Sequence, residues 1–124
     1  MTLPLLEGGH RVQAYESFSK AVRALSDLPG SNLEVDEKNA AEFDGDRRYD
    51  IAFRDPPRSG ALNICRILTG LEIPVLVYVS CDPQTLARDL TVLTEGGWAL
   101  DSIRGFDMFP HTDHLETVAV LTRG

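Results

Sequence analysis

The sequence predicts an α/β fold, a doubly wound sheet with helices on both faces. Strand-like and helix-like segments alternate over residues 11–95. The run VLVYV at residues 75–79 is continuously apolar and largely β-branched, which is typical of a strand buried on both faces of a parallel sheet. Two further strand-like segments, 98–103 and 115–121, close the chain and are expected to pair with each other in antiparallel fashion.

The first half of the chain contains two of the predicted strands. Residues 11–15 (RVQAY) predict a short strand that ends at Glu16, and residues 32–35 predict a weaker one. Between these strands, residues 17–28 carry apolar side chains at helical spacing. The acidic stretch 36–48 is expected to form a helix or loop on the surface.

The second half continues the alternation. Residues 49–54 predict a strand that runs into Asp55, and residues 61–68 predict a helix. A second helix is predicted over residues 84–95. Pro83 suits the first turn of this helix, because the amide proton that proline lacks has no partner there.

The composition suits one globular domain over residues 1–124, with 43% hydrophobic and 25% charged residues. No apolar run reaches the roughly 18 residues that a membrane span needs. The net charge of −7 counts against a general basic surface for nucleic acid. The two cysteines, Cys65 and Cys81, give neither a disulfide framework nor a zinc site, and free thiols indicate the cytoplasm.

Three polar or reactive residues, Glu16, Asp55 and Cys81, follow predicted strands directly. Ligands bind at the carboxyl ends of the strands in sheets of this kind, so these residues outline a candidate site. Cys81 also precedes a predicted helix, whose dipole favours a thiolate nucleophile. The alternative is that Cys81 packs in the core, Asp55 caps a stiff turn and Glu16 is a solvated acid.

The string HTDHLE, residues 111–116, places two histidines and two acids together. Its spacing does not match a helical zinc motif, so we do not predict a metal site. Glu116 as a general base beside the histidines is chemically more economical. A polar turn before the last strand remains the alternative.

Three motifs, taken in order, resemble one family. They are DPPRSG (55–60), VYVSCDPQTLARDL (77–90) and DMFPHTDHLETVAVL (107–121). In this order and spacing the chain resembles the RNA uracil-C5 methyltransferases, which make 5-methyluridine in transfer or large-subunit ribosomal RNA using S-adenosylmethionine. The resemblance covers nearly the whole chain and implies a Rossmann-like class I methyltransferase sheet.

The resemblance implies a role for each residue of the candidate site. Cys81 matches the nucleophile, Glu116 the proton acceptor, and Asp55 and Glu16 the residues that bind S-adenosylmethionine. The family usually has SCNP where this chain has SCDP, with Asp82. A thiolate that adds to C6 of uracil makes C5 nucleophilic, and a base must then remove the C5 proton. The target base must also leave its stack to be reached, so RNA is the expected partner.

The resemblance also implies that the family's first strand and glycine-rich loop are missing. The opening stretch TLPLLEGGHRVQAYE resembles the segment directly downstream of that loop. We therefore expect one partial methyltransferase domain over residues 1–124, with an incomplete cofactor site and without the family's N-terminal RNA-binding part. In the family the missing strand lies between the strands that end at Glu16 and Asp55. We expect these two edges to pair with each other, with a second copy in a homodimer, or with residues 1–9.

Two other functions remain open from the sequence. The chain can be a non-catalytic α/β remnant that acts as an interaction or scaffold domain. It can also be a methyltransferase that uses DPP to aim an exocyclic amine. Cys81 and Glu116 argue against the latter, because transfer to an amine needs no thiol.

Overall fold

The computed structural model describes residues 7–15, 23–24, 32–36, 48–107 and 115–124. The chain forms two compact units, Met1–Asp44 and Gly45–Gly124, and each unit is described by itself. The single partial domain expected over residues 1–124 therefore stays a prediction. Within the described residues, no helix has the length and apolar character that a membrane span requires.

The first unit contains a parallel pair of strands, β1 (Val12–Tyr15) and β2 (Leu33–Asp36). These two strands confirm the predicted segments at 11–15 and 32–35. The predicted helix at 17–28 lies outside the described residues except for Arg23 and Ala24, which are helical and exposed.

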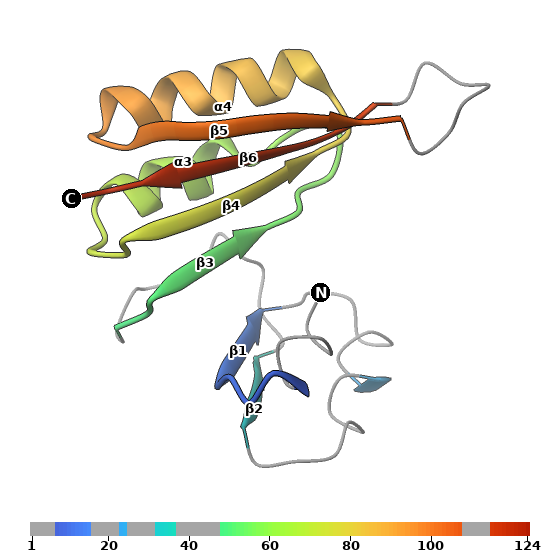
Figure 1. The fold of residues 1–124 in the computed structure, drawn as a ribbon, viewed down its shortest axis with the longest axis vertical. Coiled ribbons are helices and arrows are strands. Elements are labelled where there is room, and N and C mark those ends of the chain that lie inside the picture. The colour runs from blue at the N-terminus through green and yellow to red at the C-terminus, as the bar shows by residue number, and fades with distance from the viewer. Residues whose placement is uncertain (1–6, 16–22, 25–31, 37–47, 108–114) are drawn as a thin grey trace. The chain divides into compact units, whose positions relative to one another are not determined.

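The second unit is a four-stranded sheet with strand order β3-β4-β6-β5 (Figure 1). Its elements are β3 (Ile51–Arg54), α3 (Leu62–Thr69), β4 (Val75–Ser80), α4 (Pro83–Glu95), β5 (Ala99–Phe106) and β6 (Glu116–Thr122). Strand β4 pairs with β3 in parallel and with β6 in antiparallel fashion, and β5 pairs with β6 in antiparallel fashion. The predicted alternation and the predicted antiparallel closing pair are confirmed.

Helices α3 and α4 lie along the same face of this sheet (Figure 1). Accordingly β4 alternates, with Leu76, Tyr78 and Ser80 buried and the intervening valines half-buried. The expectation that this strand is buried on both faces was wrong for the described residues. Both of its faces are apolar, but the helices described in this unit cover one of them.

The core between sheet and helices is apolar and closely packed. Its fully buried side chains include Cys65, Leu76, Tyr78, Leu93 and Leu121. Gly96 lies where a Cβ would be 2.1 Å from Thr69 Cγ2, so a glycine is what lets the ends of α3 and α4 approach each other.

Arg123 stabilises the end of the second unit at which α3 and α4 both end. Its guanidinium donates to the carbonyls of Leu71 at 2.9 Å and Gly96 at 2.8 Å, and it lies 5.6 Å from the Trp98 ring centroid. A cation is favourable beside helix carboxyl ends, where carbonyls lack partners within the helix. The carboxyl end of β4 lies at the opposite end of the sheet (Figure 1), so Arg123 stabilises the fold without entering the candidate site.

Candidate functional site

Cys81 lies in the tight turn between β4 and α4, as predicted. Asp82 is the N-cap of α4, and its Oδ1 accepts hydrogen bonds from Gln84 N at 2.9 Å and Thr85 N at 3.1 Å. On the other side of the thiol, Ser80 Oγ donates to Asp82 O at 2.9 Å and accepts from Asp82 N at 3.1 Å. The backbone around Cys81 is therefore fixed, with the thiol held at the start of a helix of 13 residues.

The two cysteines differ in environment. Cys65 on α3 is 0% exposed, and burial, followed by the charge of the nearby Asp89, raises the pKa of its thiol to about 12. Cys81 is half-buried. A neutral, inaccessible thiol suits packing and an accessible one suits chemistry, so Cys81 is the nucleophile candidate.

Glu116 lies at the same end of the sheet as Cys81. It is the first residue of β6, and the antiparallel register pairs Ser80 of β4 with Thr117 of β6. Cys81 and Glu116 are the next residues beyond that pair, and both are half-buried. The register thus places Cys81 and Glu116, which are far apart in the sequence, at the same end of the β4–β6 pair.

Asp55 follows β3 and is exposed. The parallel register pairs Arg54 with Tyr78, so β3 and β4 end at one edge of the sheet and Asp55 shares that edge with Cys81. Pro56 is buried and anchors the start of the loop. Glu16 lies outside the described residues, and so do His111, Asp113 and His114.

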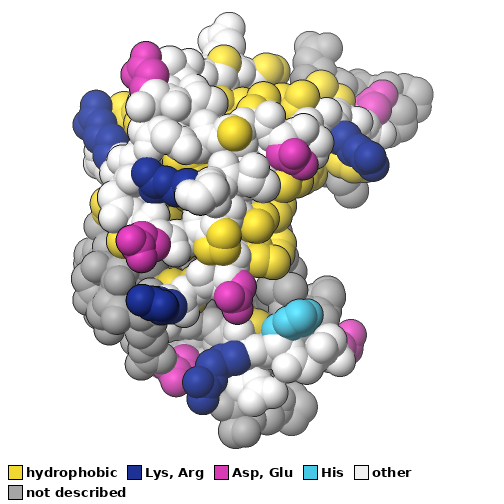
Figure 2. All heavy atoms as spheres, turned by 60° about the vertical axis from the view of Figure 1, so that its left-hand side comes forward, with side chains coloured by type: hydrophobic (Ala, Val, Ile, Leu, Met, Phe, Trp, Pro, Cys, Tyr) yellow, Lys and Arg dark blue, Asp and Glu magenta, His cyan; other side chains and the backbone are white. Residues whose placement is uncertain are grey.

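A metal site is not supported by the described residues. Within them, no group of three or more histidine, cysteine, aspartate or glutamate side chains is placed to hold an ion. Among the described atoms on the face in Figure 2, basic side chains stand apart from one another, with acidic and uncharged ones between them.

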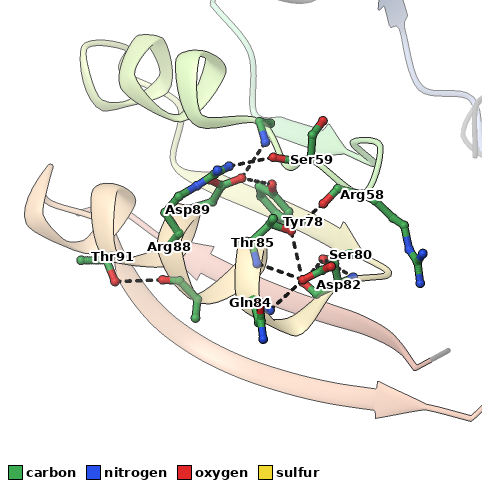
Figure 3. Close-up of polar contacts among 12 residues, drawn as sticks. Arg58, Ser59, Tyr78, Ser80, Asp82, Gln84, Thr85, Arg88, Asp89 and Thr91 are labelled. Carbon is green, nitrogen blue, oxygen red and sulfur yellow. Dashed lines mark hydrogen bonds and ion pairs between the residues drawn. The ribbon is translucent and has the colours of Figure 1, made fainter. Parts of the chain in front are cut away.

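One buried carboxylate of α4 was not predicted from the sequence. Asp89 on α4 is 0% exposed, and its Oδ2 accepts from Tyr78 Oη at 2.5 Å and from Ala61 N at 2.6 Å. Its Oδ1 accepts from Arg88 Nε at 2.9 Å and Nη2 at 2.8 Å. Figure 3 shows Asp89, Arg88 and Tyr78 turned toward one another. Burial and the bond to Asp89 raise the pKa of Tyr78, which keeps the phenol protonated as a donor.

A signal for Asp89 was present in the sequence. Leu86, Asp89 and Leu93 follow one another at helical spacing and are the buried residues of α4. A carboxylate in an apolar stripe needs partners, because an unpaired buried charge is strongly destabilising. The spacing predicts that the Asp89 carboxylate accepts hydrogen bonds, but it does not identify the donors.

Arg54 contributes a second buried charge at this edge. Its Nε is buried and has no hydrogen-bond partner among the described residues. Burial lowers the pKa of its guanidinium, and the nearby Tyr78, Cys65 and acidic groups oppose that effect. Arg54 therefore places positive charge close to Asp55 and Asp89.

Known proteins resemble this chain along most of its length. The family described as tRNA (uracil-5-)-methyltransferase matches residues 40–124, more than half of the chain. A 23S rRNA (uracil(1939)-C(5))-methyltransferase RlmD from Alteromonas naphthalenivorans is 31% identical over 131 residues, covering 98% of this chain and 28% of the relative. An uncharacterized RNA methyltransferase from Thermotoga maritima is 43% identical over 121 residues, covering 92% of this chain and 28% of the relative.

Solved structures agree with this fold. A tRNA (uracil-54, C5)-methyltransferase from Pyrococcus abyssi, solved with S-adenosyl-L-homocysteine, has a TM-score of 0.80 and 31% identity. It is matched over 95% of this chain and 30% of its own length. A Burkholderia thailandensis N1-methyltransferase shares the fold at a TM-score of 0.70 and 14% identity. The fold is thus that of class I methyltransferases, and the chain spans about 30% of the length of these uracil methyltransferases.

Proposed function

This chain belongs to the tRNA (uracil-5-)-methyltransferase family, and we propose that it is the C-terminal catalytic part of an S-adenosylmethionine-dependent RNA (uracil-5-)-methyltransferase. The observation that carries the proposal is the register between β4 and β6. It supports a thiol, Cys81, and a carboxylate, Glu116, working on the same substrate base.

Cys81 and Glu116 have successive roles in the proposed mechanism. The Cys81 thiolate forms a bond to C6 of uracil, and the electron pair of the C5–C6 double bond moves toward C5 and O4. When bound, the cofactor supplies an electrophilic methyl group on sulfonium. Once C5 is methylated, Glu116 accepts the C5 proton. The electrons of that C–H bond re-form the double bond and expel Cys81 as thiolate.

Asp55 is the cofactor-binding residue that the described part of the chain supports. Its exposed carboxylate stands at the carboxyl edge of β3, where it can accept hydrogen bonds from hydroxyl or amine groups. Glu16 has the same proposed role at the end of β1.

RNA is the proposed substrate of the complete enzyme, and the cytoplasm is its proposed compartment. The net charge of −7 and the scattered basic groups in Figure 2 indicate that this chain contributes little to RNA affinity. Its proposed contribution is the chemistry at the flipped base.

Covalent trapping tests the proposal. The chain is mixed with RNA containing 5-fluorouridine, S-adenosylmethionine and the N-terminal segment of the Thermotoga relative. We expect an RNA adduct that resists denaturation, because fluorine at C5 leaves no proton for Glu116 to remove. The adduct should be absent in Cys81→Ala, which lacks the nucleophile. With ordinary uridine RNA, Glu116→Gln should accumulate the methylated adduct. Absence of any adduct with wild-type chain and the supplied segment contradicts the proposal.

A second candidate is a non-catalytic interaction domain, including a homodimer. It is favoured by one observation: within the described residues β3 pairs only with β4, and it exposes 47% of Ile51 and 39% of Phe53. Unpaired strand edges bind further strands. Calorimetry showing no S-adenosylmethionine binding, together with a concentration-dependent dimer in sedimentation, supports this candidate. A monomer that binds the cofactor rules it out.

A further inference from the structure

The loop that carries Asp55 is held by one side of α4. Three backbone groups of the loop, at positions 58, 59 and 61, are hydrogen-bonded to three side chains within two turns of that helix. Thr85 Oγ1 donates to Arg58 O at 2.9 Å, Arg88 Nη2 donates to Ser59 O at 2.9 Å, and Asp89 Oδ2 accepts from Ala61 N at 2.6 Å. Figure 3 shows these side chains arrayed along α4 facing the loop. We name Thr85, Arg88 and Asp89 the loop clamp.

Gly60 gives independent evidence that the loop is pressed onto the clamp. Its φ is +79°, and a Cβ there would lie 2.6 Å from Arg88 Nη2, 2.7 Å from Asp89 Oδ2 and 3.2 Å from Thr85 Cβ. Gly60, which makes no direct bond to the clamp, thus lies against all three of its members. A side chain at this position is excluded both by the backbone conformation and by the space.

Asp89 also caps the N-terminus of α3, a role that no side chain of α3 itself fills. The N-cap of α3 is Ala61, which has no side-chain cap bond, and the first turn of α3 carries no acid. The Asp89 carboxylate takes the Ala61 amide and places negative charge at that helix end. The loop is therefore fixed at both ends, by the buried Pro56 and by the clamp.

Helix α4, which carries the loop clamp, begins just after Cys81. Asp82 caps α4, and the clamp residues lie one and two turns farther along it. We propose that the loop clamp positions Asp55 relative to Cys81, so that a single rigid helix sets the distance between the cofactor side and the nucleophile side of the site. This inference depends on the proposed function, because it gives Asp55 and Cys81 their roles. The clamp residues are positioning residues, since they touch the loop and not the substrate.

The test compares two changes on the same helix. Asp89 is fully buried and its removal endangers folding, so the clamp is opened at its other two residues, with Thr85→Val plus Arg88→Ala. Thr85 is half-buried, and the Arg88 side chain is 44% exposed. Thr91→Val is the matched control, because Thr91 Oγ1 bonds to Ala87 O within the helix and touches no loop atom. Hydrogen exchange is followed at the amides of Gly60 and Ala61 and, as a reference for global opening, in β6.

We expect exchange at Gly60 and Ala61 to rise about tenfold more than exchange in β6 in the double variant, and Thr91→Val to match the wild type. Exchange in β6 reports the loss of global stability that follows when Arg88→Ala leaves the buried Asp89 carboxylate without its ion pair. In the reconstituted methylation assay the KM for S-adenosylmethionine should rise about tenfold with kcat within about twofold, whereas mere loss of folded protein lowers apparent kcat alone. The inference is overturned if Gly60 and Ala61 of the double variant exchange at the wild-type rate. It is also overturned if their exchange rises but the KM for S-adenosylmethionine does not change. If the wild-type mixture is inactive, the proposed function fails and the exchange comparison alone decides whether the clamp holds the loop.

Discussion

At the scale of single residues, Asp82 shows how a departure from the family's usual sequence fits the structure. Its carboxylate accepts the amides of Gln84 and Thr85, which is the role that asparagine fills equally well at an N-cap. The negative charge is placed at the positive end of α4. Asp82 is therefore a helix cap beside the nucleophile, and SCDP and SCNP are expected to give the same turn.

This equivalence can be measured. Asp82→Asn should unfold within about 0.5 kcal/mol of the wild type, whereas Asp82→Ala should lose about 1 kcal/mol, because alanine leaves two amides without a partner. Urea unfolding followed by circular dichroism gives both values. Equal losses in the two variants would show that the cap is not the source of the stability.

Accessibility separates the two thiols. At pH 8, iodoacetamide should modify Cys81 of the folded chain within minutes and leave Cys65 unmodified, because Cys65 is buried and its pKa is raised to about 12. Peptide mass spectrometry identifies the modified residue. In urea both thiols should react, which serves as the control. Modification of Cys65 in the folded chain contradicts the assignment of the two environments.

The candidate site residues were predictable from local pattern. Cys81 and Asp55 stand where strand periodicity gives way to turn residues, and Glu116 opens the last strand. That Cys81 and Glu116 lie at one end of the sheet is given by the register between β4 and β6, a pairing that was not predicted from the sequence. Asp89 and Arg123 could not be assigned, because their partners include backbone groups 27 to 55 positions away.

At the scale of elements, helix ends in this unit are completed by distant side chains. The amide of Ala61, the N-cap of α3, donates a hydrogen bond to Asp89. Arg123 donates hydrogen bonds to carbonyls near the C-terminal ends of α3 and α4. The sequence predicted where these helices begin and end, since those limits depend on local glycine and proline. It did not predict which face of the sheet they cover, because β4 is apolar on both faces.

Arg123 should therefore be a stability residue remote from the chemistry. Arg123→Ala is expected to lower the free energy of unfolding by about 2 kcal/mol, through lost charged hydrogen bonds and the Trp98 contact. Circular dichroism in urea measures the loss. Arg66→Ala, at an exposed position of α3, is the control and should change little. An unchanged midpoint in Arg123→Ala contradicts the role, while the rate of Cys81 alkylation should be the same in all three proteins.

At the scale of the whole molecule, the described strands form two sheets, β1-β2 and β3-β4-β6-β5. What pairs with the edges of β1 and β3 stays a prediction, because an edge strand carries no local sequence signal for its partner. Burial alternates along β4 and β6, but the sequence of β4 does not show which of its side chains are buried, because both faces of that strand are apolar.

The pH dependence of stability reports on the core. Cys65 and Tyr78 are both 0% exposed and are neutral when protonated; burial is the main cause that raises the pKa of each, for Cys65 to about 12. Stability is therefore complete below their ordinary pKa values, roughly 8.5 and 10. Above about pH 9 the unfolded chain loses these protons while the folded chain keeps them, so unfolding becomes easier by about 1.4 kcal/mol per pH unit for each group.

Urea unfolding at a series of pH values between 8 and 11 measures this slope. Tyr78→Phe removes one of the two titrating groups, so the fall above about pH 10 should be shallower than in the wild type. Cys65→Ala should remove the earlier part of the fall, between about pH 9 and 10. Both variants are less stable at pH 8, because one loses a bond to Asp89 and the other leaves a cavity, so the slopes and not the absolute values decide. A wild-type free energy of unfolding that stays level from pH 8 to 11 would mean that water reaches both groups in the folded state.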